Sequence, residues 1–146
     1  MKRGAAGNVR AIRPMRILLV TDDDKYADEV ALAASLRGAE LELAAVGDDL
    51  DAATSRHLPN VIVLDAHDSL ARTSRTASIF AALYPRIAVV IVANRASERG
   101  AGGIRVVDKW RSAERLLHEL ELVFLGLGSP ATRGRERAEG GQRSES

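Results

Sequence analysis

Four short runs rich in apolar and β-branched residues stand out along the chain, and each gives way to a polar residue. They span residues 16–20, 61–64, 87–92 and 104–107. Near-continuous runs of this length predict strands covered on both faces, as in a parallel sheet. Residues 40–44 alternate polar and apolar side chains instead, which predicts a strand at the edge of the sheet with one wetter face.

Between these runs, apolar residues recur at the spacing of helices. Helices are predicted at four places: after the acidic run 22–24 as far as Gly38, over 50–57 behind Asp48 or Asp49, near 73–83 before Pro85, and from the N-cap Ser112 to Leu127. In the first of these helices Leu36 belongs to the apolar stripe. In the third, Thr76, Ile79, Phe80 and Leu83 share one side.

Strands and helices therefore alternate along the chain, which predicts an α/β fold with a parallel sheet and helices on both faces. Because crossovers are right-handed, a doubly wound, flavodoxin-like sheet of five strands in the order 2-1-3-4-5 is the leading topology. The ligand crevice of such a sheet lies at the carboxyl ends of its strands. This chain places polar residues at those ends: the run 22–24, Asp65, Asn94 and Lys109.

The domain organisation follows from the distribution of apolar residues. The compact domain is predicted over 15–127, between a loose N-terminal arm over 1–14 and a disordered C-terminal tail over 128–146. With no cysteine, the chain has no disulfides, no zinc–thiolate sites and no iron–sulfur clusters. A net charge of +1 argues against a dedicated nucleic-acid binder. Since neither a membrane-length apolar run nor a signal peptide is visible, we expect a cytoplasmic protein with no membrane partner.

The segments ILLVTDDD, VIVLDAHD and VVDKW occur in an order that resembles the receiver domain of bacterial two-component response regulators, the CheY-like superfamily. The resemblance covers about residues 15–126, and its specificity lies in the combination of the three segments. It implies a phosphorelay protein, a regulatory domain rather than an enzyme, which accepts a phosphoryl group from a sensor histidine kinase or a phosphotransfer protein. No DNA-binding domain is expected after the last helix, so the output would be contact with a partner protein.

The resemblance also assigns roles to individual residues. Asp65 matches the phosphoacceptor, and Lys109 matches the lysine that holds the acceptor or its phosphate. Asp22, Asp65 and the backbone carbonyl of His67 match the ligands of a weakly held Mg²⁺. These residue types suit the chemistry, because a carboxylate can form an acyl phosphate while cations offset the charge of the transferred group. Purely structural roles stay open as alternatives: the acids of 22–24 can cap the first helix, and Lys109 can be a surface lysine.

Several positions depart from the family pattern. Thr21 stands where the first of two acids is expected, unless the pair slips by one residue to Asp22 and Asp23, which the strand register argues against. Ala93 replaces the hydroxyl residue that contacts the phosphoryl group, and Trp110 replaces a proline, where it could cover the crevice or anchor a partner. The loop after Asp65 lacks the usual Pro and Gly, and the fourth helix, after Asn94, is expected to be shortened or missing.

These departures leave three hypotheses open. The first is a divergent, stand-alone phosphoacceptor. The second is a pseudo-receiver, a protein-binding module whose state does not depend on phosphate. The third is a small nucleotide- or cofactor-binding enzyme on the same scaffold, although no GxGxxG follows the first strand and no GxxxxGK[ST] occurs.

Overall fold

The computed structural model describes residues 14–66, 69–94 and 104–126. Nine elements alternate along the chain: β1 (Arg16–Val20), α2 (Asp24–Leu36), β2 (Glu40–Ala44), α3 (Leu50–His57), β3 (Val61–Asp65), α4 (Leu70–Leu83), β4 (Ala88–Ala93), β5 (Arg105–Asp108) and α5 (Ala113–Phe124). All strand pairs are parallel, and the sheet order is β2-β1-β3-β4-β5. The predicted doubly wound sheet and its order are confirmed, with β2 at one edge.

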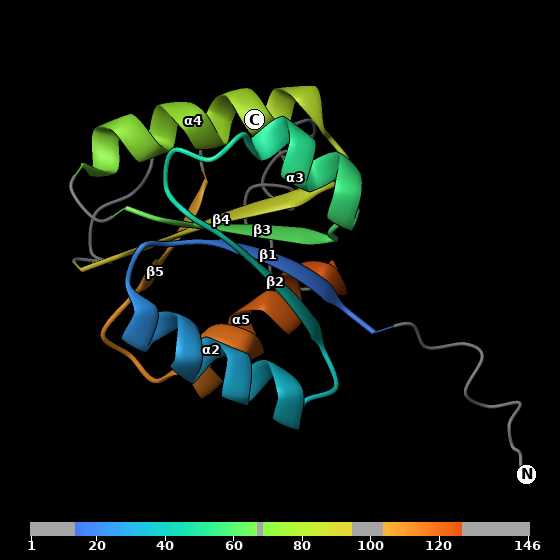
Figure 1. Ribbon diagram of the computed structural model, residues 1–146, viewed down its shortest axis with the longest axis vertical. Coiled ribbons are helices and arrows are strands. Elements are labelled where there is room, and N and C mark those ends of the chain that lie inside the picture. The colour runs from blue at the N-terminus through green and yellow to red at the C-terminus, as the bar shows by residue number, and fades with distance from the viewer. Residues whose placement is uncertain (1–13, 67–68, 95–103, 127–146) are drawn as a thin grey trace, which may run out of the picture.

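The helices form a layer on each face of the sheet. Figure 1 shows α2 and α5 below the sheet and α3 and α4 above it, and β1 passes into α2 at the left. Neighbouring residues of one strand point to opposite faces, so each central strand supplies both layers. Ile17 and Leu19 pack with α2 and α5, whereas Leu18 packs with α3 and α4. The fully buried central strands explain why their sequences are nearly continuous in apolar residues.

Each helix begins at a side chain that caps its first turn. The caps are Asp23 for α2, Asp49 for α3, Ser69 for α4 and Ser112 for α5, each accepting a backbone N–H of its own helix. The predicted caps Asp49 and Ser112 are therefore confirmed. Gly38 follows α2 with φ +74°, a left-handed conformation that suits glycine after a helix.

The prediction of which side chains face the core is partly wrong. In α4 the buried residues are Ser74, Ala77 and Phe80, while Ile79 and Leu83 are exposed. The helix begins three residues earlier than predicted, because Ser69 caps it. The small side chains of Ser74 and Ala77 give α4 a flat face toward the sheet, and the more apolar Ile79 and Leu83 turn to solvent.

Two further apolar positions differ in the same way. Leu36, expected in the stripe of α2, is exposed at the end of that helix, and Phe124, which the apolar periodicity places in the stripe of the last helix, is 38% exposed at the end of α5. The strands β4 and β5 are expected to begin at residues 87 and 104, and each begins one residue later, at Ala88 and Arg105.

Some expectations fall outside the described residues. They are the arm before Pro14, the tail over 128–146, and the shortened or missing fourth helix, since 95–103 are not described. Within residues 14–66, 69–94 and 104–126, none of the helices has the length and apolar character needed to cross a membrane.

Candidate functional site

Asp65 is the last residue of β3 and lies at the carboxyl edge of the sheet. Its side chain is only 1% exposed. In the register of β1 and β3, Val20 lies opposite Leu64, so the next residues along, Thr21 and Asp65, are neighbours. Because successive side chains of a strand alternate between its two faces, Thr21 and Asp65 both lie on the face covered by α2 and α5. The strand register therefore places a threonine hydroxyl beside the predicted phosphoacceptor.

The two carboxylate oxygens of Asp65 have different surroundings. Oδ2 accepts a hydrogen bond from the Thr21 hydroxyl at 2.6 Å and another from the Lys109 ammonium at 2.9 Å. Oδ1 is buried and has no hydrogen-bond partner among the residues that the structure describes. A buried carboxylate oxygen without a partner is rare in folded proteins, and a catalytic role, a bound ion or a water molecule can account for it. Asp65 thus has one oxygen held in place and one buried oxygen that no described residue holds.

Lys109 connects three groups at this edge of the sheet. It follows β5, and its backbone N–H donates to Ala93 at 2.7 Å, which extends the pairing of β4 and β5. Its ammonium lies 2.9 Å from Asp65 Oδ2, 3.0 Å from Asp23 Oδ2 and 5.1 Å from the centre of the Tyr26 ring. Burial alone would lower the pKa of Lys109, but its hydrogen bonds to Asp65 and Asp23 outweigh burial and raise the pKa. The lysine is therefore a fixed positive charge between two carboxylates.

Asp23 serves both the helix and the site. Its Oδ1 accepts the Tyr26 N–H at 3.0 Å and caps α2, while its Oδ2 pairs with Lys109. The Tyr26 N–H, followed by Lys109, lowers the pKa of Asp23. The Asp23 backbone N–H also donates to the Thr21 hydroxyl at 3.0 Å. Asp65, Thr21, Asp23 and Lys109 thereby form a closed ring of hydrogen bonds.

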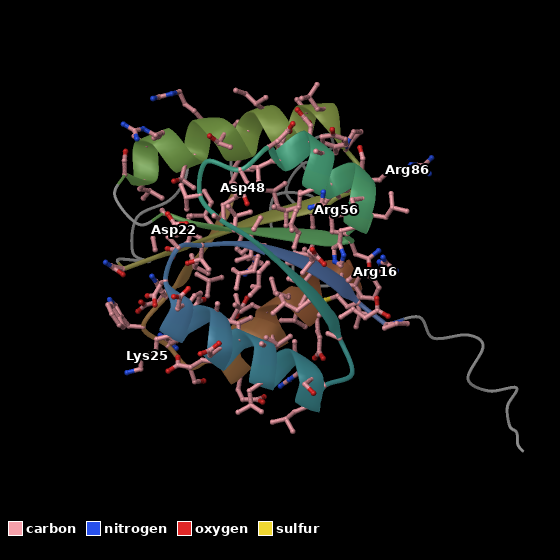
Figure 2. All side chains as sticks on the ribbon, viewed as in Figure 1. Arg16, Asp22, Lys25, Asp48, Arg56 and Arg86 are labelled. Atoms are coloured by element: carbon pink, nitrogen blue, oxygen red, sulfur yellow. The ribbon has the colours of Figure 1, made fainter. Side chains whose placement is uncertain are left out.

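Asp22, predicted as a metal ligand, points in another direction. It is exposed, and its Oδ1 accepts the backbone N–H of Val46 at 2.9 Å, in the loop between β2 and α3. Figure 2 shows Asp22 where β1 gives way to α2, on the opposite side of that turn from Lys25. The structure brings Asp65 and Lys109 together, but it ties one oxygen of Asp22 to a neighbouring loop. Its role as a ligand stays a prediction.

The described residues fit a cation at Asp65 only in part. Asp65 Oδ1 is a carboxylate oxygen that no described residue contacts by a hydrogen bond, and it is the type of ligand that Mg²⁺ prefers. His67, whose carbonyl is the third expected ligand, lies outside the described residues. In the described ranges, no three or more His, Cys, Asp or Glu side chains are grouped so that they could hold a metal ion. A cation here would therefore need Asp65 Oδ1 together with other oxygens, from backbone carbonyls, from water or from Asp22 Oδ2, since only Oδ1 of Asp22 is held by Val46.

Two predicted departures from the family pattern bear on this site. Ala93 is buried at the end of β4 and brings no hydroxyl to Asp65. Trp110 is 73% exposed, and its roles as a cover of the crevice or as an anchor for a partner both stay predictions.

Thr21 and Asp23 belong to the site, although the sequence patterns did not predict either of them there. From sequence, Thr21 is only a missing acid, and Asp23 is only a cap or half of a slipped pair. The alternation along β1 is a usable signal, because Ile17, Leu19 and Thr21 share one face with Asp65. The register extends the pairing of Val20 with Leu64 to Thr21 and Asp65, and which residues match the acidic pair of the family stays a prediction. No comparable signal marks Asp23, whose contact with Lys109 depends on how the turn into α2 is shaped.

Comparison with solved structures finds receiver domains. The response regulator receiver domain protein (CheY-like) from Methanospirillum hungatei JF-1 is 21% identical, with a TM-score of 0.65, over 79% of this chain and 97% of that one. The chemotaxis response regulator CheY4 of Vibrio cholerae is 20% identical, with a TM-score of 0.63, over 76% and 99%. An atypical orphan response regulator, whose structure is described as revealing a phosphorylation-independent regulatory mechanism, is 18% identical, with a TM-score of 0.59, over 79% and 99%.

No protein-family model and no curated protein matches the sequence. The structural likeness nevertheless extends over almost the full length of each of these receivers. The chain therefore has the fold of the CheY-like response regulator receiver domains.

Proposed function

We propose that this chain is a signalling receiver that accepts a phosphoryl group on Asp65. The donor would be a histidine kinase or a phosphotransfer protein in the cytoplasm, and the output would be contact with a partner protein. One observation carries the proposal: Asp65 Oδ2 is held by Lys109 and Thr21, while Oδ1 has no partner within residues 14–66, 69–94 and 104–126. A carboxylate fixed in this way would direct the attack to Oδ1 once the atoms that cover it have moved, which lowers the entropy cost of the reaction.

In the proposed reaction, Asp65 Oδ1 forms a bond to phosphorus as the bond from phosphorus to the donor atom breaks. The donor leaves with the electron pair, and the product is an acyl phosphate on Asp65. The Lys109 ammonium, 2.9 Å from Oδ2, offsets negative charge at the carboxyl group throughout. When bound, Mg²⁺ would offset charge on the phosphoryl oxygens, with Asp22, Asp65 and the carbonyl of His67 as the proposed ligands.

Two observations favour a second candidate, a receiver whose state does not depend on phosphate. Ala93 leaves the end of β4 without a hydroxyl, so the usual link from phosphate to conformation is missing there. Asp65 Oδ1 is also buried, so a donor reaches it only when covering atoms move. The likeness to the atypical orphan regulator adds support of the same kind. In this alternative, the Asp65–Lys109 pair holds the domain in one binding-competent state.

The test is the intact mass of the protein after incubation with Mg²⁺ and a small acyl phosphate. Asp65→Asn removes the acceptor, and Asp24→Asn is the matched control because Asp24 is exposed in the first turn of α2. We expect one added phosphoryl group on the wild type and on Asp24→Asn, and none on Asp65→Asn or in the presence of a chelator. A wild type that gains nothing would favour the second candidate, and a gain that persists in Asp65→Asn would place the acceptor elsewhere.

A further inference from the structure

The hydroxyl of Thr21 is fixed by both of its hydrogen-bonding functions. Its oxygen accepts the backbone N–H of Asp23 at 3.0 Å, and its single hydrogen is donated to Asp65 Oδ2 at 2.6 Å. The residue is buried, and its backbone N–H donates to Ala44 at 3.0 Å, so it stays in register with β2 as well. Because the Thr21 oxygen accepts the Asp23 N–H, the hydroxyl cannot point its hydrogen away from Asp65 without losing one of these two hydrogen bonds.

The charges around Asp65 explain why a neutral donor matters at this position. The ring holds two carboxylates, Asp65 and Asp23, and one ammonium, Lys109. Thr21 adds a hydrogen bond to Asp65 without adding a charge. A carboxylate at position 21 would instead lie next to Asp65 and repel it, with a single ammonium to offset three negative charges. A divalent cation, which prefers carboxylate oxygens as ligands, would offset this repulsion.

We propose that Thr21 is a positioning residue that replaces a bound cation in stabilising Asp65. It fixes Oδ2 and so leaves Oδ1 as the reacting oxygen, and it makes the folded site independent of divalent metal. Only the choice of reacting oxygen rests on the proposed phosphoacceptor function; the independence from metal does not. The inference implies that Mg²⁺ binds the wild type weakly and leaves its stability unchanged.

The first test compares the wild type with Thr21→Asp during titration with MgCl₂, with NaCl at equal ionic strength as the control. The readouts are the thermal unfolding midpoint and the fluorescence of Trp110, which is the single tryptophan of the chain and follows Lys109 directly. Without Mg²⁺, we expect Thr21→Asp to have a lower midpoint than the wild type. Added Mg²⁺ should restore that midpoint while leaving the wild type unchanged.

We expect the Mg²⁺ affinity of Thr21→Asp to be at least tenfold higher than that of the wild type, about 1.4 kcal/mol. The double variant Thr21→Asp with Asp65→Asn should lose this gain, because the second carboxylate of the site is gone. Equal affinities for the wild type and Thr21→Asp would overturn the inference. So would a wild-type midpoint that rises with Mg²⁺ as steeply as that of the variant.

Two uncharged variants keep the inference testable if Thr21→Asp does not fold. Thr21→Val removes the hydroxyl at nearly constant volume, and Thr21→Ser keeps it. We expect Thr21→Val to lower the unfolding midpoint and Thr21→Ser to restore it, and we expect Thr21→Val alone to slow phosphorylation of Asp65 by an acyl phosphate about tenfold. Equal midpoints for all three proteins would overturn the positioning role. A wild type that is never phosphorylated would count against the proposed function. The unfolding midpoints and the Mg²⁺ titration test the role of Thr21 independently of phosphorylation.

Discussion

The Lys109 ammonium lies 2.9 Å from Asp65 Oδ2, with the two side chains 6% and 1% exposed. A charge pair this deeply buried is stable only while both partners are present, because either group alone would be an uncompensated charge in the interior. Asp23 and Thr21 add to the pair from the turn between β1 and α2. The stability of the sheet edge and the chemistry of Asp65 therefore depend on the same few side chains.

Replacing Lys109 by Met should be strongly destabilising, because the methionine leaves the Asp65 carboxylate buried without its cation. We expect a loss of about 3–5 kcal/mol in the free energy of unfolding, measured by urea denaturation. Lys25→Met is the matched control, since Lys25 points to solvent at the start of α2 (Figure 2), and it should change stability by less than about 0.5 kcal/mol. Similar losses of unfolding free energy in Lys109→Met and Lys25→Met would contradict the claim that Lys109 and Asp65 form a buried charge pair.

Asp23 should make folding sensitive to acid. Its pKa is lowered in the folded state, first by the Tyr26 N–H and then by Lys109, so its contribution is present above the ordinary value of 3.8 and is lost as the pH falls through the lowered pKa. Asparagine also caps helices, so Asp23→Asn removes mainly the charge. The wild type should be more stable than Asp23→Asn at pH 7, and their thermal midpoints should converge below about pH 4. A difference between the two thermal midpoints that does not narrow in acid would show that the charge of Asp23 does not stabilise the folded state.

The core between the sheet and α5 should be intolerant of truncation at Leu117. This side chain is fully buried among β-strand and α2 residues, so Leu117→Ala should cost about 2–5 kcal/mol in unfolding free energy. Leu36→Ala removes the same atoms from a side chain that is 72% exposed, and it should cost less than about 1 kcal/mol. Chemical denaturation of both variants checks the assignment of the two leucines. A larger loss for Leu36→Ala would mean that the outer face of α2 is covered.

Leu58 offers a stabilising substitution. It ends α3 in the left-handed conformation, at φ 54° and ψ 60°, and its side chain is exposed. A glycine avoids the clash of Cβ with the backbone there, so Leu58→Gly should stabilise the fold by about 0.5–1 kcal/mol. Ala31→Gly, in the middle of α2, should instead destabilise it by about 1 kcal/mol. Thermal unfolding of the two variants should move in opposite directions, and a loss of stability in Leu58→Gly would contradict the observed conformation.

The sequence was sufficient to predict the sheet because parallel strands buried on both faces have nearly continuous apolar sequences. It was also sufficient to predict that Asp65 and Lys109 meet, because the carboxyl ends of parallel strands share one edge. The direction of Asp22 was not predictable in this way. Its carboxylate accepts the Val46 N–H, which belongs to a loop whose path depends on the packing of α3.

The face of α4 shows a second limit. Ile79 and Leu83 lie four residues apart, as do many pairs on a packed helix face, and periodicity alone assigns them to the core. The buried face instead contains Ser74, Ala77 and Phe80, which also recur at helical spacing. When a helix carries apolar residues on two sides, the fit of small side chains against the sheet decides which side is buried.

The identity of the acceptor can be tested most directly by trapping the acyl phosphate where it forms. The protein would be treated with Mg²⁺ and a small acyl phosphate and then reduced with borohydride, which converts a phosphorylated aspartate into homoserine. Peptide mass mapping then reads which residue has changed. The account predicts homoserine at Asp65 in the wild type and no change at Asp22, Asp23 or Asp24. Conversion within that acidic run, or none at Asp65, would contradict the claim that Asp65 is the phosphoacceptor.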